Sequence, residues 1–382
     1  MAAVIVVAVV FWVAVGLLVY AQVGYPLLLE LLGRARRGPA VAGAAPDAAE
    51  PSVSLVIAAH REAPIIAAKV ANARELDWPA ERLEVIVACD GSPDDTPARA
   101  RAAGADVVLE LPWGGKVRAQ DAAVERAGGE LLAFSDANAL WEPGALRALA
   151  AAFDDARVGY ACGQVRFLSD AGTNQEGLYW RYEMAIRARE SQLQSVTAGN
   201  GAIYAVRPEA YLHVDPIMGH DLSLPFNMVK RGWRALYVPS ARAVEKMVPT
   251  VEGEFARKRR MMSHTWPIVL RGGMLSPRGY PPLYAAMMLS HRVLRYCTPG
   301  LHVLALAANV ALLAAGAGAL YWVTLALQLA LLGAALVAGA LGWRPLLIAR
   351  YYVLTTASPA AGLWDWLRHG TAPWWDAAEG TR

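Results

Sequence analysis

The sequence has 382 residues, of which 56% are hydrophobic and only 18% are charged. Because soluble domains are usually more polar, this composition predicts that part of the chain lies in a lipid bilayer. The net charge of +3, without Lys/Arg runs interleaved with aromatic residues, argues against nucleic-acid binding. The three cysteines are far apart in sequence and form neither a zinc-binding pattern nor a disulfide framework, as expected for a domain on the reducing, cytosolic side of a membrane.

An apolar segment at residues 3–31 exceeds the length of about 20 residues that spans a bilayer. It is too long for a signal peptide, has no preceding Lys or Arg and lacks a small-residue cleavage site, so we expect a membrane anchor. Arg34, Arg36 and Arg37 follow it, and the positive-inside rule places the next part of the chain in the cytosol. Residues 38–50, rich in Ala, Gly and Pro, predict a linker.

Short apolar runs then alternate with helical stretches rich in alanine and charge. The predicted strands are 53–58, 83–88 and 131–134, and the predicted helices are 64–76, 96–103 and 116–127. This alternation predicts an α/β domain with a parallel sheet covered by helices. In such sheets ligands bind beyond the carboxyl ends of the strands.

The C-terminal third is again membrane-like. Residues 251–296 mix charge with bulky apolar side chains, which favours amphipathic helices on an anionic membrane face over solvated surface helices. Apolar segments near 297–317 and 319–341 are joined by an uncharged turn, expected outside, and Arg344 marks the return to the cytosol. Residues 346–365 predict either a third C-terminal span or a helix pair dipping into the interface. The absence of an internal repeat argues against a transporter built on inverted repeats.

Polar residues follow the predicted strands. His60 and Glu62 follow the first, and Asp90 follows the second in an Asp-Gly-Ser turn that can bind a base or ribose but is more often only a turn. Gly114-Gly115-Lys116 opens a helix, where free backbone N–H groups and a lysine suit a phosphate, although the GxxxxGK[ST] pattern is not met.

The third strand ends in Phe-Ser-Asp136-Ala-Asn138. Two oxygen-bearing side chains one residue apart can face the same Mg²⁺ or Mn²⁺, which are hard ions that prefer oxygen ligands. Such an ion would bridge two phosphates and stabilise the charge that builds as a nucleoside diphosphate leaves.

Taken in order, these motifs resemble those of the family 2 glycosyltransferases of GT-A fold. The resemblance is strongest to membrane-bound polysaccharide synthases related to cellulose, hyaluronan and poly-N-acetylglucosamine synthases. It continues through residues 197–207, which are similar to the acceptor-side loop, and through His220-Asp221, where the family has a Glu-Asp pair. It covers residues 51 to about 270 and implies a Rossmann-like mixed sheet with helices on both faces.

The resemblance also implies roles on the donor side. Ala58, His60, Glu62 and Asp90 would line a uracil and ribose pocket. Lys116 would lie near the nucleotide, and Asp136 would bind the metal with Asn138.

On the acceptor side, the resemblance implies that Asp221 is the general base of an inverting transfer. A carboxylate in a partly dry pocket near a diphosphate can hold the raised pKa that this task needs. Asp221 could also cap a helix N-terminus, and the two roles are compatible. The resemblance assigns the following residues to the acceptor or the diphosphate: Gly199, Asn200, Gly201, His220, Arg257, Arg260 and Trp266.

Three departures from the family pattern leave the product open. Asn138 replaces a second carboxylate, which weakens the metal site by one charge. His220 replaces a glutamate and adds a group expected to titrate near neutrality. Met261 and Met262 follow Arg260 where the polymerising relatives have a tryptophan. Single-sugar transfer to polyprenyl phosphate or another lipid is therefore an alternative to polymerisation, and a catalytically weak scaffold that binds nucleotide-sugar is a third possibility.

We therefore expect a multi-pass protein of the inner or plasma membrane with a cytosolic catalytic domain. Its expected partners are a nucleotide-sugar (UDP-linked by preference), a glycan or lipid-linked acceptor, the bilayer, and export or accessory subunits. The expected organisation is a transmembrane helix at 1–33, a linker at 34–50, the GT-A domain at 51–250, interfacial helices at 251–296, transmembrane or re-entrant helices at 297–365, and a cytosolic tail at 366–382.

Overall fold

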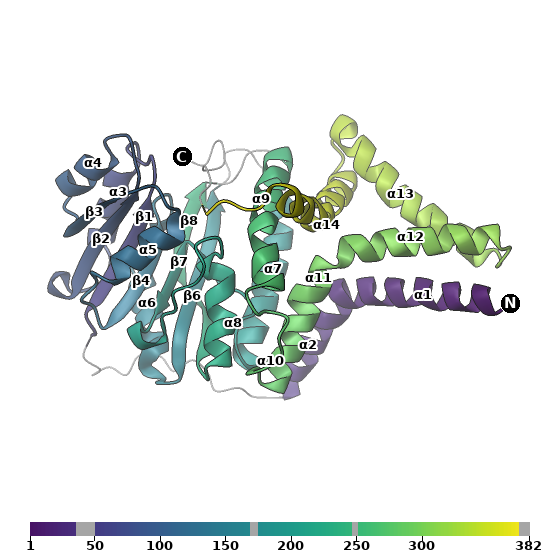
Figure 1. Cartoon of the computed structure of the whole chain (residues 1–382), viewed down its shortest axis with the longest axis horizontal. Coiled ribbons are helices and arrows are strands. Elements are labelled where there is room, and N and C mark those ends of the chain that lie inside the picture. The colour runs from purple at the N-terminus through teal and green to yellow at the C-terminus, as the bar shows by residue number, and fades with distance from the viewer. Residues whose placement is uncertain (36–49, 169–174, 247–250, 374–382) are drawn as a thin grey trace.

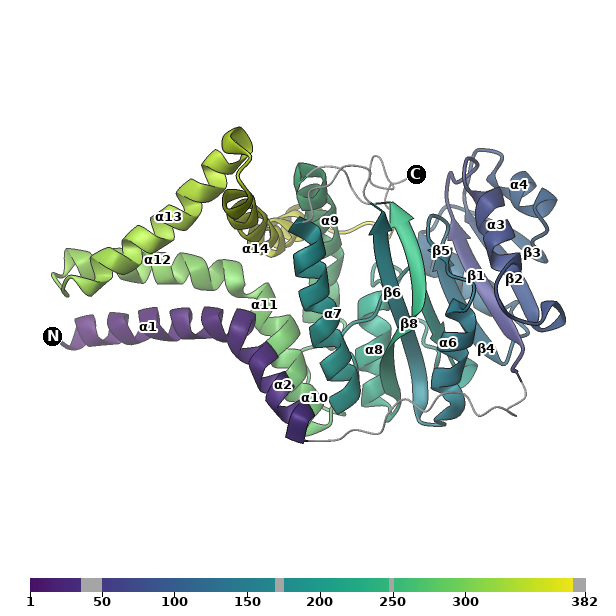
Figure 2. The ribbon, with the colours of Figure 1, turned by 180° about the vertical axis from the view of Figure 1, so that it is seen from behind.

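The computed structural model describes residues 1–35, 50–168, 175–246 and 251–373. A sheet with covering helices forms one end of the molecule, and apolar helices project from it to form the other end, as Figures 1 and 2 show. The α/β domain predicted from the alternation of strands and helices is therefore confirmed.

In the described chain the sheet has eight strands in the order β3-β2-β1-β4-β7-β6-β8-β5. The first four strands in this order are mutually parallel, β7 runs antiparallel to β4 and β6, and β6 and β8 are parallel. The mixed sheet that the resemblance implied is thus confirmed. The strands are β1 (Val53–Ala59), β2 (Leu83–Asp90), β3 (Val107–Leu111), β4 (Leu131–Asp136), β5 (Leu140–Trp141), β6 (Val158–Leu168), β7 (Ile203–Val206) and β8 (Arg234–Lys246).

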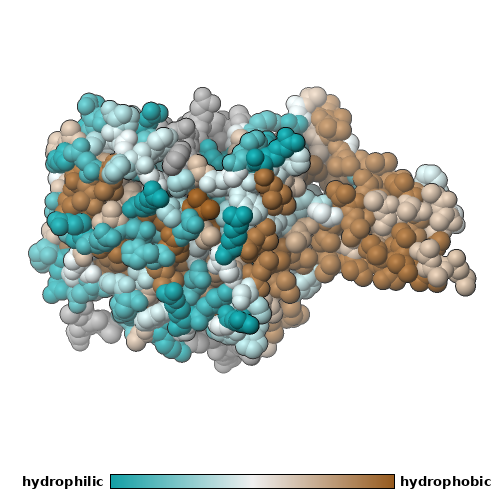
Figure 3. Space-filling view, in the orientation of Figure 1, coloured by the Kyte–Doolittle hydropathy of each residue, from teal (hydrophilic) through white to brown (hydrophobic). Residues whose placement is uncertain are grey.

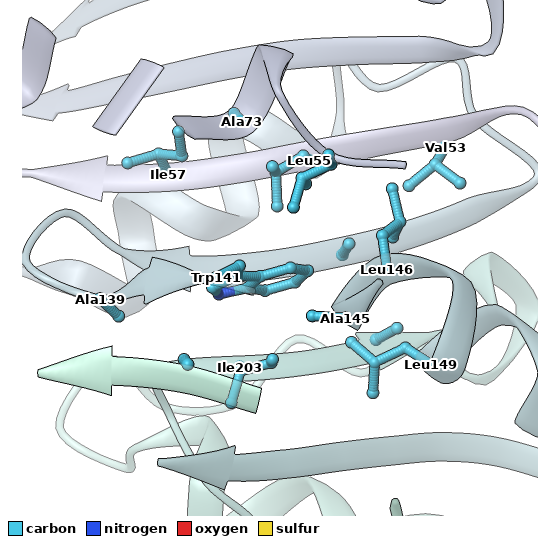
Figure 4. Close-up of a cluster of buried hydrophobic side chains, with 14 of the residues drawn as sticks. Val53, Leu55, Ile57, Ala73, Ala139, Trp141, Ala145, Leu146, Leu149 and Ile203 are labelled. Carbon is cyan, nitrogen blue, oxygen red and sulfur yellow. The ribbon is translucent and has the colours of Figure 1, made fainter. Parts of the chain in front are cut away.

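Helices cover both faces of the sheet because side chains alternate along each strand. Val53, Leu55 and Ile57 of β1 point to the face covered by α3 and α6 (Figure 4). Val56 points to the opposite face, into a second core cluster with residues of α5 and α8. The helices of this domain are α3 (Ile66–Arg74), α4 (Thr96–Ala102), α5 (Lys116–Val124), α6 (Ala145–Ala151), α7 (Gln175–Leu193) and α8 (His220–Lys230).

Within the described residues, two helices are long and apolar enough to cross a membrane. The first, Ala2–Ala35, comprises α1 (Ala2–Val19), a π-helical turn (Tyr20–Gly24) and α2 (Tyr25–Ala35), and the second is α13 (Leu320–Leu341). Large apolar side chains on both are exposed, so this end of the molecule is brown in Figure 3. In water such a surface would be costly, whereas lipid would cover it.

A bent pair of helices packs beside the N-terminal helix. Residues Pro282–Tyr296, which form α10 (Pro282–Met287), a π-helical turn (Met288–Val293) and α11 (Leu294–Tyr296), meet α12 (Thr298–Ala314) at a bend of 62°. Together they have the length and composition of a broken span or a re-entrant loop. α12 packs along α1 through Ala305, Ala308 and Phe11.

The helix that follows β8 packs against the last helix of the described chain at the edge of the sheet domain. α9 (Val251–Leu270) and α14 (Arg344–His369) are joined by two hydrogen bonds of 2.6 Å between Arg259 and Asp365. Residues 346–365 thus form one continuous helix, so the expected helix pair is wrong. The alternative of a third C-terminal span is not supported either, because α14 is not apolar enough to be counted among the candidate spans.

Candidate active site

The carboxyl ends of β1, β2 and β4 meet at one edge of the sheet. Ala58 of β1 is in register with Ala88 of β2 on one side and with Asp136 of β4 on the other. The residues that follow these strands therefore gather at one place, as parallel pairing requires. Among them, the ring of His60 hydrogen-bonds the Asp90 carbonyl at 2.6 Å.

Asp90 holds the glycine loop that precedes α5. Its two carboxylate oxygens accept hydrogen bonds from the N–H groups of Gly114 (2.7 Å) and Gly115 (2.9 Å). The expectation that these amides are free for a phosphate is therefore wrong, because a buried carboxylate already uses them. Gly115 has φ +96°, and a Cβ there would lie 2.2 Å from the carbonyl oxygen of Pro373, so the end of the described chain lies against this loop.

The ring of Trp113 stacks on His60, with 5.7 Å between centroids and 10° between planes. Beside it, the N–H of Glu62 donates to the Thr96 hydroxyl at 2.9 Å, which ties the turn after β1 to the start of α4. The side chains expected to line a base and ribose pocket are thus neighbours, and an aromatic platform lies among them.

Lys116 connects the donor side to the acceptor-side loop. Its ammonium forms an ion pair with Asp136 and lies 3.4 Å from the Gly201 carbonyl. A Cβ placed on Gly201 would lie 3.5 Å from the Lys116 ammonium nitrogen and 3.8 Å from the Asp221 Cβ. Lys116 therefore lies between Asp136 and Gly201, and Gly201 also adjoins Asp221, so groups from three separate elements form one cluster.

The charges at this place perturb one another. Desolvation lowers the pKa of Lys116, but the charges of Asp136 and Asp221 outweigh it and the pKa is raised. Desolvation raises the pKa of Asp221, and the nearby Lys116 only partly offsets this. Asp221 lies in the first turn of α8, whose N-cap is Gly219, so the interpretation of Asp221 as the helix cap is wrong.

Two charged residues of this site were not anticipated from the sequence. Glu245, near the end of β8, has its pKa raised to about 7, chiefly by desolvation and then by the charge of Asp136. Lys69 of α3 is fully buried, and its ammonium donates to the Ala139 carbonyl at 2.6 Å, below the turn that carries Asn138. A charge inside an otherwise apolar strand or helix face was the available signal for both.

The described residues contain no group of three or more His, Cys, Asp or Glu side chains that could hold a metal ion by itself. Mg²⁺ and Mn²⁺ sites in nucleotide-using enzymes commonly need only one or two protein ligands, since substrate phosphates complete them. Asp136 and Asn138, which lie one residue apart at the end of β4, meet that requirement. The residues present therefore fit a divalent ion bound together with a diphosphate.

Comparison with known proteins agrees with this geometry. Residues 54–211 match the family described as Glycosyl transferase family 2. The chain carries a family 2 glycosyltransferase domain. An N-acetylglucosaminyltransferase from Rhizobium leguminosarum bv. viciae is 29% identical over 231 residues, covering 55% of this chain and 54% of that protein. Another from Rhizobium sp. (strain N33) is 27% identical, with 55% and 51% covered. The chain thus spans about half the length of the curated relatives it matches.

A solved structure of a mannosyltransferase from Pyrobaculum calidifontis, in complex with GDP-Man and Mn²⁺, matches with a TM-score of 0.70. The match covers 94% of this chain and 99% of that one at 24% sequence identity. At this identity the likeness establishes the fold, which is the GT-A fold of the family 2 glycosyltransferases, here together with the apolar helices at both ends.

His220 of the glycosyltransferase domain differs from expectation. It is buried, and its ring nitrogens lie 2.9 Å from the Tyr204 hydroxyl and 3.5 Å from the Tyr211 hydroxyl. Desolvation lowers its pKa to about 3, so the expectation of titration near neutrality is wrong. Its side chain is enclosed in the core by the two tyrosines.

Trp266 also differs from the role that the resemblance implied. It is 9% exposed, and its indole N–H donates to the Pro359 carbonyl at 2.8 Å in the contact between α9 and α14. A sugar cannot stack on a ring enclosed in this way. Arg257, in the second turn of α9, makes two hydrogen bonds of 2.7 Å to Glu254, and its charge partly offsets the rise in the pKa of Glu245.

The remaining acceptor-side residues lie in the connection between α7 and β7. The Gly199 N–H donates to the Asp221 carbonyl at 2.6 Å, and the Asn200 side chain accepts from the Ala202 N–H at 3.0 Å. The structure therefore brings Gly199, Asn200 and Gly201 next to Asp221. Arg260 lies farther along α9, where its charge adds to desolvation in lowering the pKa of His264.

Proposed function

We propose that the chain is an inverting, divalent-metal-dependent glycosyltransferase that moves a sugar from a nucleotide-sugar, with UDP as its nucleotide, to a membrane-associated acceptor. The observation that carries the proposal is the cluster in which Lys116 pairs with Asp136 and adjoins Gly201, which in turn adjoins Asp221. A cation, a carboxylate suited to a metal ion and a base in one cluster are the groups that such a transfer requires.

Asp136 and Asn138 would hold the Mg²⁺ or Mn²⁺ ion. The ion, when bound, would neutralise the charge on the departing diphosphate. Lys116 already neutralises Asp136 and would turn its ammonium toward the diphosphate. His60, Glu62 and Asp90 lie at the neighbouring strand ends, where a base and ribose would bind.

Asp221 would act as the general base. In this step its carboxylate accepts the proton of the acceptor hydroxyl while that oxygen forms the new bond to the anomeric carbon. The bond from that carbon to the diphosphate breaks with its electron pair on the diphosphate, so one displacement inverts the configuration. The raised pKa of Asp221 suits proton transfer because it brings the base closer to the operating pH.

The enclosed position of Trp266 favours transfer of a single sugar over polymerisation. A polymerising site needs an aromatic platform for the growing glycan, and the candidate ring is bonded to Pro359 instead. We propose a lipid-linked acceptor, because the site adjoins apolar helices suited to a bilayer. In this arrangement the catalytic domain lies in the cytosol and the chain crosses the inner or plasma membrane more than once.

The test is release of nucleoside diphosphate by the full chain in lipid nanodiscs, with Mn²⁺ or Mg²⁺ and a panel of donors. UDP-N-acetylglucosamine comes first because of the names of the curated relatives, followed by UDP-glucose and GDP-mannose. We expect metal-dependent release from at least one donor, abolished by EDTA. The absence of release from every donor would overturn the proposal in favour of a nucleotide-sugar-binding scaffold. Mass spectrometry of the product decides between one added sugar and many.

A further inference from the structure

Glu190 of α7 is a fully buried carboxylate outside the transfer site. It accepts hydrogen bonds from the Tyr25 hydroxyl at 2.6 Å, and from the N–H (3.2 Å) and hydroxyl (2.9 Å) of Thr197. The ring nitrogen Nδ1 of His291 lies 2.7 Å from the same carboxylate. One side chain therefore joins three segments, one of which, at Tyr25, lies 165 residues from Glu190 in sequence.

Two of these segments are interruptions in apolar helices. Tyr25 directly follows the π-helical turn Tyr20–Gly24, and His291 lies inside the π-helical turn Met288–Val293. The two turns touch, since the Tyr20 hydroxyl lies 3.0 Å from the Ser290 hydroxyl. A π-helical turn shifts the direction of the side chains that follow it, and such turns are frequent at functional sites. Here both turns direct polar groups from candidate membrane helices to Glu190.

The third segment leads directly into the transfer site. Thr197 is held from the other side by Arg292, whose Nε donates to its hydroxyl at 2.9 Å. Two residues later, the Gly199 N–H donates to the Asp221 carbonyl, and Gly201 accepts from Lys116. The loop from Thr197 to Gly201 is thus fixed at its start by the helices and in its remaining length by the catalytic groups.

Glu190 is ionised in this arrangement. Desolvation raises its pKa, but the charges of His291 and Arg292 and the hydrogen bonds from His291 and Tyr25 outweigh that effect, and the pKa lies below its ordinary value. Hydrogen bonds to an ionised acceptor are stronger than those between neutral groups. The carboxylate can therefore fix the backbone of Thr197 more firmly than a neutral side chain would.

We infer that Glu190 is a positioning residue, which holds the loop from Thr197 to Gly201 against the two interrupted helices so that their packing sets the alignment of Asp221 with the acceptor. The inference rests on the proposed function for the reaction that the loop serves. The part of the inference that concerns structure, namely that Glu190 holds this loop in place, does not depend on that reaction.

Hydrogen–deuterium exchange of the full chain in nanodiscs tests the structural content without any substrate. Glu190→Gln keeps the shape of the side chain and removes its charge, and we expect exchange at residues 197–201 to become roughly tenfold faster or more. Tyr25→Phe should raise the same exchange by a smaller factor. Tyr280→Phe is the matched control, because its hydroxyl donates to the Met274 carbonyl and not to Glu190 or Thr197. Unchanged exchange at 197–201 in Glu190→Gln, or an equal rise throughout the sheet domain, would overturn the inference.

Kinetics with UDP-N-acetylglucosamine as donor and octyl N-acetylglucosaminide as acceptor separates positioning from general damage. We expect transfer to the octyl glycoside to fall about 100-fold in Glu190→Gln, since small misplacements of reacting groups have effects of that size. Hydrolysis of the donor and its KM should stay at the wild-type level. An equal loss of transfer and hydrolysis would indicate a purely structural role. If the wild type turns over neither probe, the proposed function fails for this donor while the exchange experiment still decides the role of Glu190.

Discussion

The donor side and the acceptor side of this site are built differently. On the donor side, Asp90 bonds Gly114 and Gly115, which lie 24 and 25 residues away along a regular strand–helix alternation. On the acceptor side, Thr197 is bound by Arg292 across 95 residues, and the partners come from helices suited to a membrane. The donor half therefore depends on local folding of a parallel sheet, whereas the acceptor half depends on how the apolar helices pack.

The largest effect is expected on the donor side, for Asp136→Ala. Loss of the metal-binding carboxylate also leaves the Lys116 ammonium without its ion pair, and we expect kcat for nucleoside diphosphate release to fall roughly 10⁴-fold. Asp154→Ala, which changes an exposed aspartate of the same domain, is the control and should retain full activity. Activity in Asp136→Ala that still depends on Mn²⁺ would show that the ion binds elsewhere.

Asp221→Asn probes the acceptor side and should lower kcat about 10³-fold, as for loss of a general base. The raised pKa of Asp221 means that its contribution to the free energy of unfolding is present below its ordinary pKa of 3.8 and is lost as pH rises through the raised value. At neutral pH the variant should therefore unfold at the same temperature as the wild type or a higher one. Wild-type kcat should decline as pH falls through the raised pKa, because a general base must be deprotonated to accept a proton.

Differential scanning fluorimetry and product release over a pH series measure both properties of Asp221→Asn. Asp215→Asn, in the exposed turn before α8, is its control. Surviving transfer in Asp221→Asn would contradict the assignment of the base, whereas lost transfer with a lower unfolding temperature would point to damage of the fold.

The difference between the two halves also explains what the sequence could predict. The strands carrying His60, Asp90 and Asp136 are short apolar runs followed by polar residues, so their convergence follows from parallel pairing alone. β3 was missed because its side chains are mostly half-buried at the edge of the sheet and its apolar run is only Val107-Val108-Leu109. Glu190 was missed because its partners lie on distant segments, and no local pattern specifies which segments meet.

The burial of His220 and Trp266 was unpredictable for a related reason. Each lies next to residues that match the family pattern, yet packing fixes the direction of its side chain. Tyr204 and Tyr211 enclose His220, and Pro359 of a helix 93 residues away encloses Trp266. Position in a motif therefore predicted proximity to the site better than it predicted the role of the side chain.

A smaller effect on the donor side is expected for Asn138→Asp. A second carboxylate adds one negative charge to the proposed ligand pair, and charge count raises affinity for hard cations. We expect the Mn²⁺ concentration for half-maximal activity to fall severalfold, with kcat changed little. The control is Asp154→Asn, at an exposed position. Asn72→Asp would not serve, because the Asn72 side chain hydrogen-bonds both the N–H and the carbonyl of Trp141. An unchanged Mn²⁺ requirement in Asn138→Asp would show that this position does not face the ion.

The smallest effect is expected for Trp266→Phe, which tests whether the acceptor side polymerises. The substitution removes the indole N–H bond to the Pro359 carbonyl while keeping an aromatic ring, and it should lower the free energy of unfolding by about 1 kcal/mol. Because the ring is enclosed between α9 and α14, transfer rate and product length should both stay at the wild-type values. Chemical denaturation and mass spectrometry of the product measure the two outcomes. Shorter products at unchanged stability would mean that Trp266 leaves its enclosed position to bind a growing glycan, and the acceptor side would then be a polymerising site.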